Sequence, residues 1–171
     1  MQHDLAWLNS LSAHAAANEL RQCCGSRRWA RQMTDARPFE NLADLIKQAN
    51  EIWWSLDRDD WLEAFRSHPR IGEKKSAETV SAQAREWSSN EQAGVNTAST
   101  ETTDALATLN RTYEQRFGYI FIICATGKSS GEMLAALRER LQHDEAGELP
   151  VAAAEQSKIT ELRLKKLLTG A

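Results

Sequence analysis

Hydrophobic residues recur at intervals of three and four along most of this chain, which is the spacing of one face of an α-helix. The strongest patterns run through residues 42–53 and 106–117. The same spacing predicts further helices over 5–9, 13–24 and 27–33, from Asp57 to the stop at His68-Pro69, from Ser129 to Leu141, and over 151–168. Gly118 is well placed to end the helix that starts at Thr100. We therefore expect an all-α fold.

Two S-x-x-E sequences are typical of capping boxes, in which a serine starts a helix and a glutamate three residues later bonds back to it. One is Ser88 with Glu91, which predicts a helix that continues through Gln92 to about Asn96. The other is Ser129 with Glu132. Residues 144–150, which end in a proline, are expected to form a connection before the last helix.

Residues 119–125 are a continuous apolar run without alternation of polar and apolar positions. This pattern indicates a strand-like, extended segment that is buried on all sides. No other run in the sequence offers it a partner strand. Its backbone N–H and C=O groups therefore need other partners: helix ends, side chains or a polar ligand.

Composition sets limits on the class of protein. The length of 171 residues fits a single domain, 1–171, and the net charge of −3, with both signs interspersed, lacks the basic footprint of a nucleic-acid binder. No apolar run approaches the roughly 20 residues that span a bilayer, and we see no signal peptide. Three cysteines, two of them adjacent, suggest neither a disulfide framework nor a metal pair. We expect a cytoplasmic protein with neither nucleic-acid nor membrane partners.

His68 is the first candidate for chemistry. Pro69 disfavours a helical conformation at His68, so the helix should stop there, and Gly72 adds a second break. The imidazole would then lie on a short turn at a helix end, and histidine is the side chain that titrates closest to neutrality. The alternative is that His68 only marks the end of a helix, and the turn by itself favours this simpler interpretation.

Arg163 is the second candidate. It lies four residues after Ile159 and four before Leu167, on a face of the last helix that should be at least partly buried. A buried guanidinium favours a planar anion such as a carboxylate. That anion could belong to a ligand or to a protein side chain, and the side chain could instead extend its head group into water.

Several familiar chemistries can be set aside. The sequence has no glycine-rich phosphate loop, no H-E-x-x-H motif and no G-x-S-x-G motif. The four histidines are dispersed without the spacing of metal ligands. Either a cofactor-independent reaction or no reaction at all remains.

Three blocks of sequence, in order, carry a resemblance to a known family. They are H-P-R-I-G at 68–72, S-S-N-E-Q-A-G at 88–94 and F-G-Y-I-F-I-I-C at 117–124, followed by Arg163-Leu164. Together they closely resemble the 2-oxo-4-hydroxy-4-carboxy-5-ureidoimidazoline (OHCU) decarboxylases over nearly the whole chain. These enzymes act late in urate breakdown and release (S)-allantoin.

The resemblance implies an all-α homodimer with no metal and no organic cofactor. It also implies His68 as the catalytic proton donor and Glu91 as its functional partner. Arg163 would face the negative charge of the substrate. The other implied substrate-binding residues are Pro69, by shape alone, with Ser88, Gln92 and the backbone of Phe121, Ile122, Ile123, Cys124 and Ala125.

Two alternatives remain at this level. One is a non-catalytic helical binding module of the same fold, and the other is a lyase or hydrolase that acts on another ureido compound. The joint presence of His68, Glu91 and Arg163 favours catalysis over binding alone. Residues 73–85 are more polar than the resemblance leads us to expect, and Arg70 is expected to be a solvated surface charge.

Overall fold

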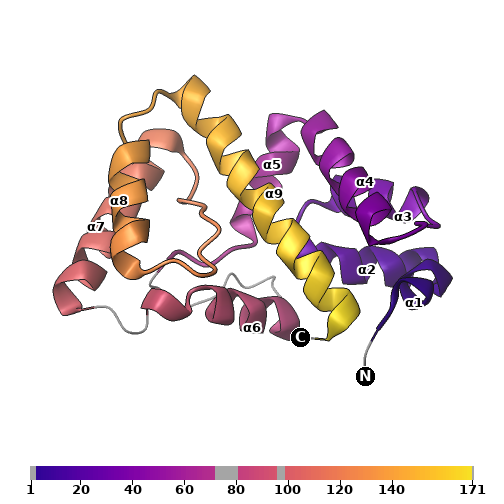
Figure 1. The fold of residues 1–171 in the computed structure, drawn as a ribbon. Helices are drawn as coiled ribbons and strands as arrows, with labels where there is room; N and C mark the ends of the chain where they lie inside the picture. Colours follow the sequence, from indigo (N-terminus) through magenta and orange to yellow (C-terminus); the bar gives the residue numbers. More distant parts are fainter. Residues whose placement is uncertain (1–2, 72–80, 96–98, 171) are drawn as a thin grey trace. The chain divides into compact units, whose positions relative to one another are not determined.

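The computed structural model describes residues 3–71, 81–95 and 99–170, and all regular structure within these ranges is helical. This confirms the all-α class. Gly72, residues 73–80 of the polar segment and Asn96 lie outside the described ranges. The elements, drawn in Figure 1, are α1 (Leu5–Ser10), α2 (Ala13–Cys23), α3 (Arg27–Asp35), α4 (Leu42–Ser55), α5 (Arg58–Arg66), α6 (Ala82–Glu91), the 3₁₀ turn η1 (Ala93–Val95), α7 (Thr100–Phe117), α8 (Ser130–Arg140) and α9 (Glu145–Thr169).

The helices begin where short polar side chains can cap them. In each of seven cases the side-chain oxygen of the N-cap residue accepts a hydrogen bond from the backbone N–H three residues later, which satisfies one of the open donors of the first turn. These N-cap residues are Asp4, Ser12, Ser26, Asn41, Ser81, Ser99 and Ser129. Gly118 ends α7 in the left-handed conformation, with φ of 80°, as its position predicts.

Two compact units make up the structure, and we describe each by itself. The first contains residues up to Ala64 together with the chain from Ser157 onward, and the second runs from Phe65 to Gln156. Helices α5 and α9 contribute residues to both. The expectation of a single domain over 1–171 stays a prediction.

In the first unit, α3 packs against both α2 and α4. Its core includes the fully buried Trp29, whose indole N–H donates to the carbonyl of Ala49 at 3.1 Å and so joins α3 to α4. The guanidinium of Arg37 donates to the carbonyls of Leu8 and Leu11, both at 2.8 Å. This contact satisfies acceptors at the end of α1, which that helix leaves open.

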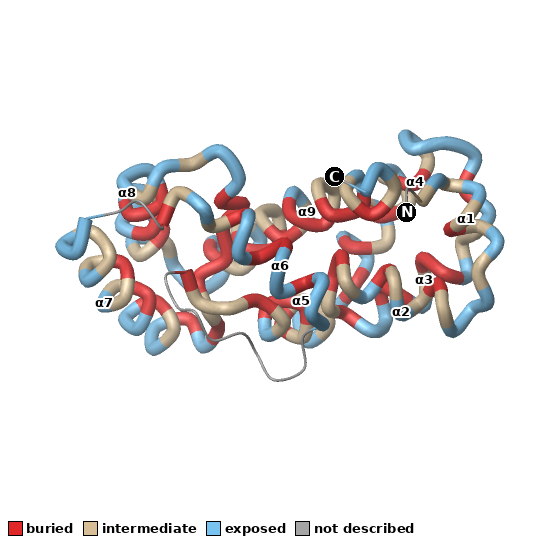
Figure 2. The backbone as a smooth tube through the Cα atoms, turned by 90° about the horizontal axis from the view of Figure 1, so that it is seen from below, coloured by how far each residue is buried: buried red, intermediate tan, exposed pale blue. Residues whose placement is uncertain are grey.

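In the second unit, α7 packs against α8, and the connecting chain folds back beside them (orange in Figure 1). Buried and exposed positions alternate turn by turn along α7 (Figure 2). The aromatic rings of Tyr113 and Phe117 lie 4.6 Å apart, and that of Phe121 lies 5.3 Å from Tyr113. These rings fix the apolar segment against α7.

Two predictions about helix starts are wrong. Ser88 does not start a helix, because Ser81 caps α6 seven residues earlier, and Ser88 and Glu91 instead lie one turn apart on a buried face near its end. Residues 144–150 are not a connection, because α9 already begins at Glu145 and contains Pro150. The Asp144 carboxylate accepts from Gly147 N–H at 2.7 Å and so caps this start. Tertiary contacts of the fully buried Glu148 hold the turn in a helix against its weak propensity.

Residues 119–125 are buried apart from the half-buried Ile120, as expected, but within the described part of the chain they have no regular secondary structure and do not form the predicted strand. Side chains are partners of the Ile122 carbonyl and of both polar backbone groups of Cys124, and the Ala125 carbonyl accepts from the backbone N–H of Lys128. This confirms one of the three kinds of partner that the sequence left open.

Candidate active site

His68 lies two residues after α5 ends at Arg66, close to the predicted stop. Its backbone N–H donates to the carbonyl of Phe65 at 3.1 Å, and the residue is only 9% exposed. The imidazole Nε2 lies 2.7 Å from Oε1 of Gln156, which is fully buried on α9. The side chain is therefore held at a defined place by a helix distant in sequence.

The residues that follow His68 are tied to α7. Arg70 makes two parallel hydrogen bonds to the Glu114 carboxylate, at 2.8 and 2.9 Å, so this partly exposed charge, which was expected only to be solvated, is also ion-paired. Asn110 donates to the carbonyl of Ile71 at 3.1 Å. Hydrogen bonding by Arg70 lowers the pKa of the Glu114 carboxyl below its ordinary value. The turn that carries His68 is thus fixed by α7 and α9.

Helix α6 presents the second group of predicted residues. Ser88 and Glu91 are 4% and 9% exposed, while Gln92 is half-buried at the C-cap, where its N–H donates to the Ser88 carbonyl at 3.2 Å. The next turn approaches the backbone of Lys128 so closely that a Cβ on Gly94 would collide with the Lys128 carbonyl oxygen. A glycine is required there because the chain between α7 and α8 passes directly against η1.

The apolar segment is held by charged side chains at its polar groups. The carbonyl of Ile122 accepts from the Arg140 guanidinium at 2.5 Å. The N–H of Cys124 donates to the Glu155 carboxylate at 2.8 Å, and the Cys124 carbonyl accepts from the Lys128 ammonium at 3.0 Å. These groups of the segment are satisfied by the protein itself.

The pKa of the Cys124 thiol shows which charged groups lie near the apolar segment. Its pKa is raised, first by burial, then by the negative charge of Glu155, with a smaller contribution from Glu91, while Lys128 opposes the rise. Glu91 therefore lies within electrostatic reach of the apolar segment. A neutral thiol follows, which does not act as a nucleophile.

A buried ionic cluster lies beneath the segment. The fully buried Glu148 accepts from the Tyr113 hydroxyl at 2.5 Å, from Arg140 at 2.6 Å and from His143 at 2.8 Å. The Arg140 guanidinium also lies 4.5 Å from the centre of the Phe121 ring. Since Arg140 bonds both Glu148 and the Ile122 carbonyl, the cluster links α7, α8 and α9 to the apolar segment.

Arg163 belongs to the first unit and is 2% exposed, so its head group does not extend into water. It donates to the carbonyl of Gln22 at 3.3 Å. Its charge also lowers the pKa of Cys24, although burial dominates and raises that pKa to about 12. Its expected role of facing the negative charge of the substrate stays a prediction.

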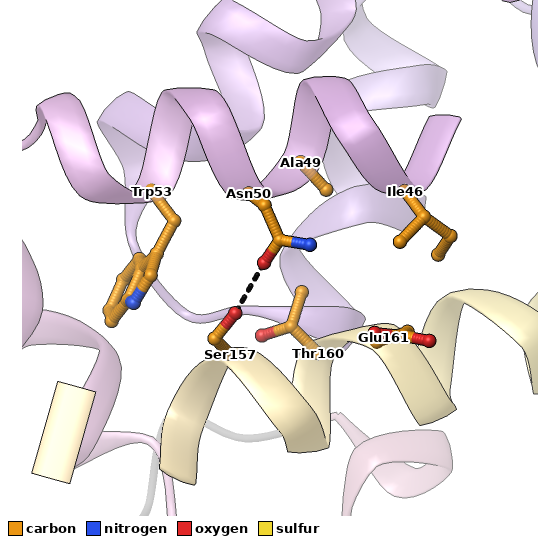
Figure 3. A pocket seen from close by; sticks show the side chains of 7 residues that line it. All are labelled: Ile46, Ala49, Asn50, Trp53, Ser157, Thr160 and Glu161. Carbon is orange, nitrogen blue, oxygen red and sulfur yellow. Dashed lines mark hydrogen bonds between the residues drawn. The ribbon is translucent and has the colours of Figure 1, made fainter. Parts of the chain in front are cut away.

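A small pocket in the first unit lies between α4 and α9 (Figure 3). Asn50 and Ser157 point toward one another across it and form a hydrogen bond of 2.5 Å. Its volume of about 10 Å³ leaves room for about one water molecule. It is too small for a ureidoimidazoline ring, and none of the predicted site residues lines it.

The structure thus brings several predicted residues into one unit through contacts that the sequence analysis missed. Gln156 contacts His68, and its neighbour Glu155 contacts Cys124. The negative charge of Glu91 contributes to the raised pKa of the Cys124 thiol. A signal for Gln156 exists in the sequence. It lies in the helical stripe of buried positions that includes Ala152, Ile159 and Arg163, where a polar residue requires a partner.

Two general findings limit the class of site. Over the described ranges, no group of three or more His, Cys, Asp or Glu residues is placed to hold a metal ion. No helix in the same ranges is long and apolar enough to cross a bilayer.

The fold and the His68 turn define an all-helical protein with a buried histidine at a helix end. Residues 9–165 match the model of the OHCU decarboxylase family. The chain therefore belongs to this family.

Individual relatives agree with the family match. The chain is 42% identical over 153 residues to the uric acid degradation bifunctional protein TTL of Arabidopsis thaliana, which covers 89% of this chain and 47% of that protein, so the chain spans about half its length. It is 30% identical over 135 residues to the 2-oxo-4-hydroxy-4-carboxy-5-ureidoimidazoline decarboxylase of Haloferax volcanii, with 79% of this chain and 77% of that protein covered. A crystal structure of OHCU decarboxylase in the presence of (S)-allantoin is similar with a TM-score of 0.76 and 39% identity, over 88% of this chain and 97% of that one.

Proposed function

We propose that this protein decarboxylates OHCU to (S)-allantoin in urate degradation, without a cofactor, and that it works as a homodimer. Membership of the OHCU decarboxylase family supports the reaction. The observation that carries the proposal for this chain is the setting of His68, buried on a turn that α7 and α9 hold in place.

His68 is the proton donor in this proposal. The substrate carbon bears a hydroxyl and the departing carboxylate next to an imine-like ring carbon. When the C–C bond to the carboxylate breaks, CO₂ leaves and the electron pair delocalises into the ring. A proton delivered to one face then completes the reaction and sets the handedness of the product. One positioned acid typically contributes about 10²–10⁴-fold to such a rate.

Glu91 is the functional partner of His68. A carboxylate near the imidazole favours its protonated form and so keeps a proton available. Ser88, on the same buried face of α6, and Gln92 at the helix end would bind the ureido and ring amides. Pro69 contributes by the shape that it gives to the turn.

The backbone of Phe121 to Ala125 supplies further polar contacts to the substrate. The carbonyls of Ile122, Cys124 and Ala125 and the Cys124 N–H already have partners in the protein, so we assign substrate binding to the remaining backbone groups of the segment. Preorganised backbone donors stabilise developing charge at low cost because they do not reorganise during the reaction. Arg163 would provide the positive charge for the substrate carboxylate.

The experiment that tests the reaction generates OHCU in place. Urate is converted by the two upstream enzymes, this protein is added, and the circular dichroism of allantoin is followed. A rapid signal of one hand, absent without the protein, supports both the reaction and its stereochemistry. A slow racemic background that the protein does not change would contradict the proposal. Analytical ultracentrifugation of the purified protein tests the dimer: the mass of two chains supports it, and the mass of one chain contradicts it.

A further inference from the structure

Gln156 occupies an unusual place for a glutamine. It is fully buried, and its amide oxygen Oε1 lies 2.7 Å from Nε2 of His68, which is 88 residues away in sequence. A buried amide is costly unless its groups are hydrogen-bonded. Other orientations of the His68 ring would break this hydrogen bond and leave the buried amide oxygen without it. The cost of burying Gln156 therefore favours one orientation of the ring.

The chemistry of the two atoms determines where the proton lies. An amide oxygen only accepts hydrogen bonds, whereas an imidazole nitrogen either donates or accepts. With Oε1 facing Nε2, the ring nitrogen must donate. The neutral imidazole then carries its proton on Nε2, which leaves Nδ1 as the nitrogen that gains and loses a proton.

We propose that Gln156 is a positioning residue that keeps the His68 proton on Nε2 and so assigns proton transfer to Nδ1. This rests on the proposed role of His68 as proton donor. Gln156 does not contact the substrate in this scheme. It acts through His68, by fixing the ring plane and the tautomer.

The neighbouring contacts support this role. Glu155, the preceding residue on α9, binds the Cys124 N–H at 2.8 Å, so two successive side chains of one helix turn contact both the His68 turn and the apolar segment. A shift of α9 at this turn would move both. The charged groups in this region are Glu91 on α6, Glu155 on α9, Lys128 after the apolar segment, and Arg70, which is paired with Glu114.

The test compares Gln156→Met and Gln156→Glu with matched changes at the exposed Gln83 of α6. The ¹⁵N resonances of His68 are followed across pH in the full chain. In the wild type we expect neutral His68 to show protonated Nε2 and unprotonated Nδ1. Gln156→Met should mix the two tautomers. Gln156→Glu should raise the His68 pKa by about one to three units, because a carboxylate replaces the amide at the same distance.

Activity supplies the second readout. Gln156→Met should lower kcat by up to about 100-fold, because the His68 ring is no longer held in place. KM should change little, because Gln156 does not contact the substrate. The Gln83 variants should match the wild type in both measurements. Unchanged ¹⁵N shifts and an unchanged His68 pKa in the Gln156 variants would overturn the inference. If Gln156→Met does not fold, the wild-type spectrum and Gln156→Glu decide.

The outcomes separate this inference from the proposed function. The resonances report the contact whether or not His68 acts in catalysis. If the shifts respond to Gln156 but His68→Asn remains fully active, then the contact stands while the catalytic role of His68 fails. If His68→Asn is inactive and the ¹⁵N resonances of His68 do not change in the Gln156 variants, then only the positioning role fails.

Discussion

The hydroxyl of Tyr113 donates to the carboxylate of Glu148 across 2.5 Å, and the carboxylate has no exposure to solvent. This bond joins the C-terminal part of α7 to the first turn of α9. Glu148 also bonds Arg140, which in turn holds the Ile122 carbonyl. The position of the apolar segment therefore depends on a fully buried acid.

Tyr113→Phe should destabilise the protein by about 1–3 kcal/mol, since it removes a donor from a buried carboxylate. Chemical denaturation would measure the loss. Thr112→Val is the matched control, because it removes an exposed hydroxyl from the same helix. Equal stabilities for the two variants would mean that the Glu148 cluster contributes nothing through Tyr113.

Glu114→Gln should lower stability by less than about 1 kcal/mol, because the ion pair with Arg70 is partly exposed. The pKa of Glu114 is lowered in the folded state, so its contribution is fully present above the ordinary value of 4.5 and is lost as pH falls through the folded pKa. The gap in Tm between variant and wild type should therefore close in acid. Glu139→Gln on α8 is the control. A gap that stays constant down to low pH would contradict the pairing.

Gly94→Ala should destabilise the second unit by about 1–3 kcal/mol, because the new methyl group collides with the Lys128 carbonyl and forces η1 away from it. Thermal unfolding would measure this. At Gly131 on α8 an added Cβ meets only the Ser129 hydroxyl at 3.9 Å, so Gly131→Ala should cause no loss. Similar losses of stability in the two variants would contradict the explanation that the close approach of the Lys128 carbonyl requires a glycine at 94.

His68→Ala should abolish turnover of OHCU while the helical circular dichroism is retained. The change removes the proposed acid, and its loss costs about 10²–10⁴-fold or more. The coupled assay with in-place OHCU measures the rate. Activity near that of the wild type would exclude His68 from the mechanism.

Arg163→Leu should raise KM for the substrate, because a positive charge that faces the substrate carboxylate is lost. Lys165→Met removes an exposed charge from the same helix and serves as the control. If KM is unchanged while the free energy of unfolding falls, Arg163 is structural, in line with its bond to the Gln22 carbonyl.

Sequence alone predicted the helices whose apolar spacing is regular, and it found the stop at His68 because the effect of Pro69 is local. It failed at Ser88, where an S-x-x-E spacing of three fits a helix start and equally fits two neighbours on one helix face. It failed at 144–150 because the contacts of Glu148 come from α7 and α8, which no local pattern reports. Gln156, Glu155 and Lys128 were missed for the same reason, since their partners are distant or are backbone groups.

The run 119–125 is apolar and rich in β-formers, with no charge and no proline, the composition of segments that stack into intermolecular sheets when exposed. The native structure gives it no sheet edge, because Arg140, Glu155 and Lys128 occupy polar groups of its backbone. The side chains that hold the segment in place therefore also occupy hydrogen-bonding groups that an intermolecular sheet would need.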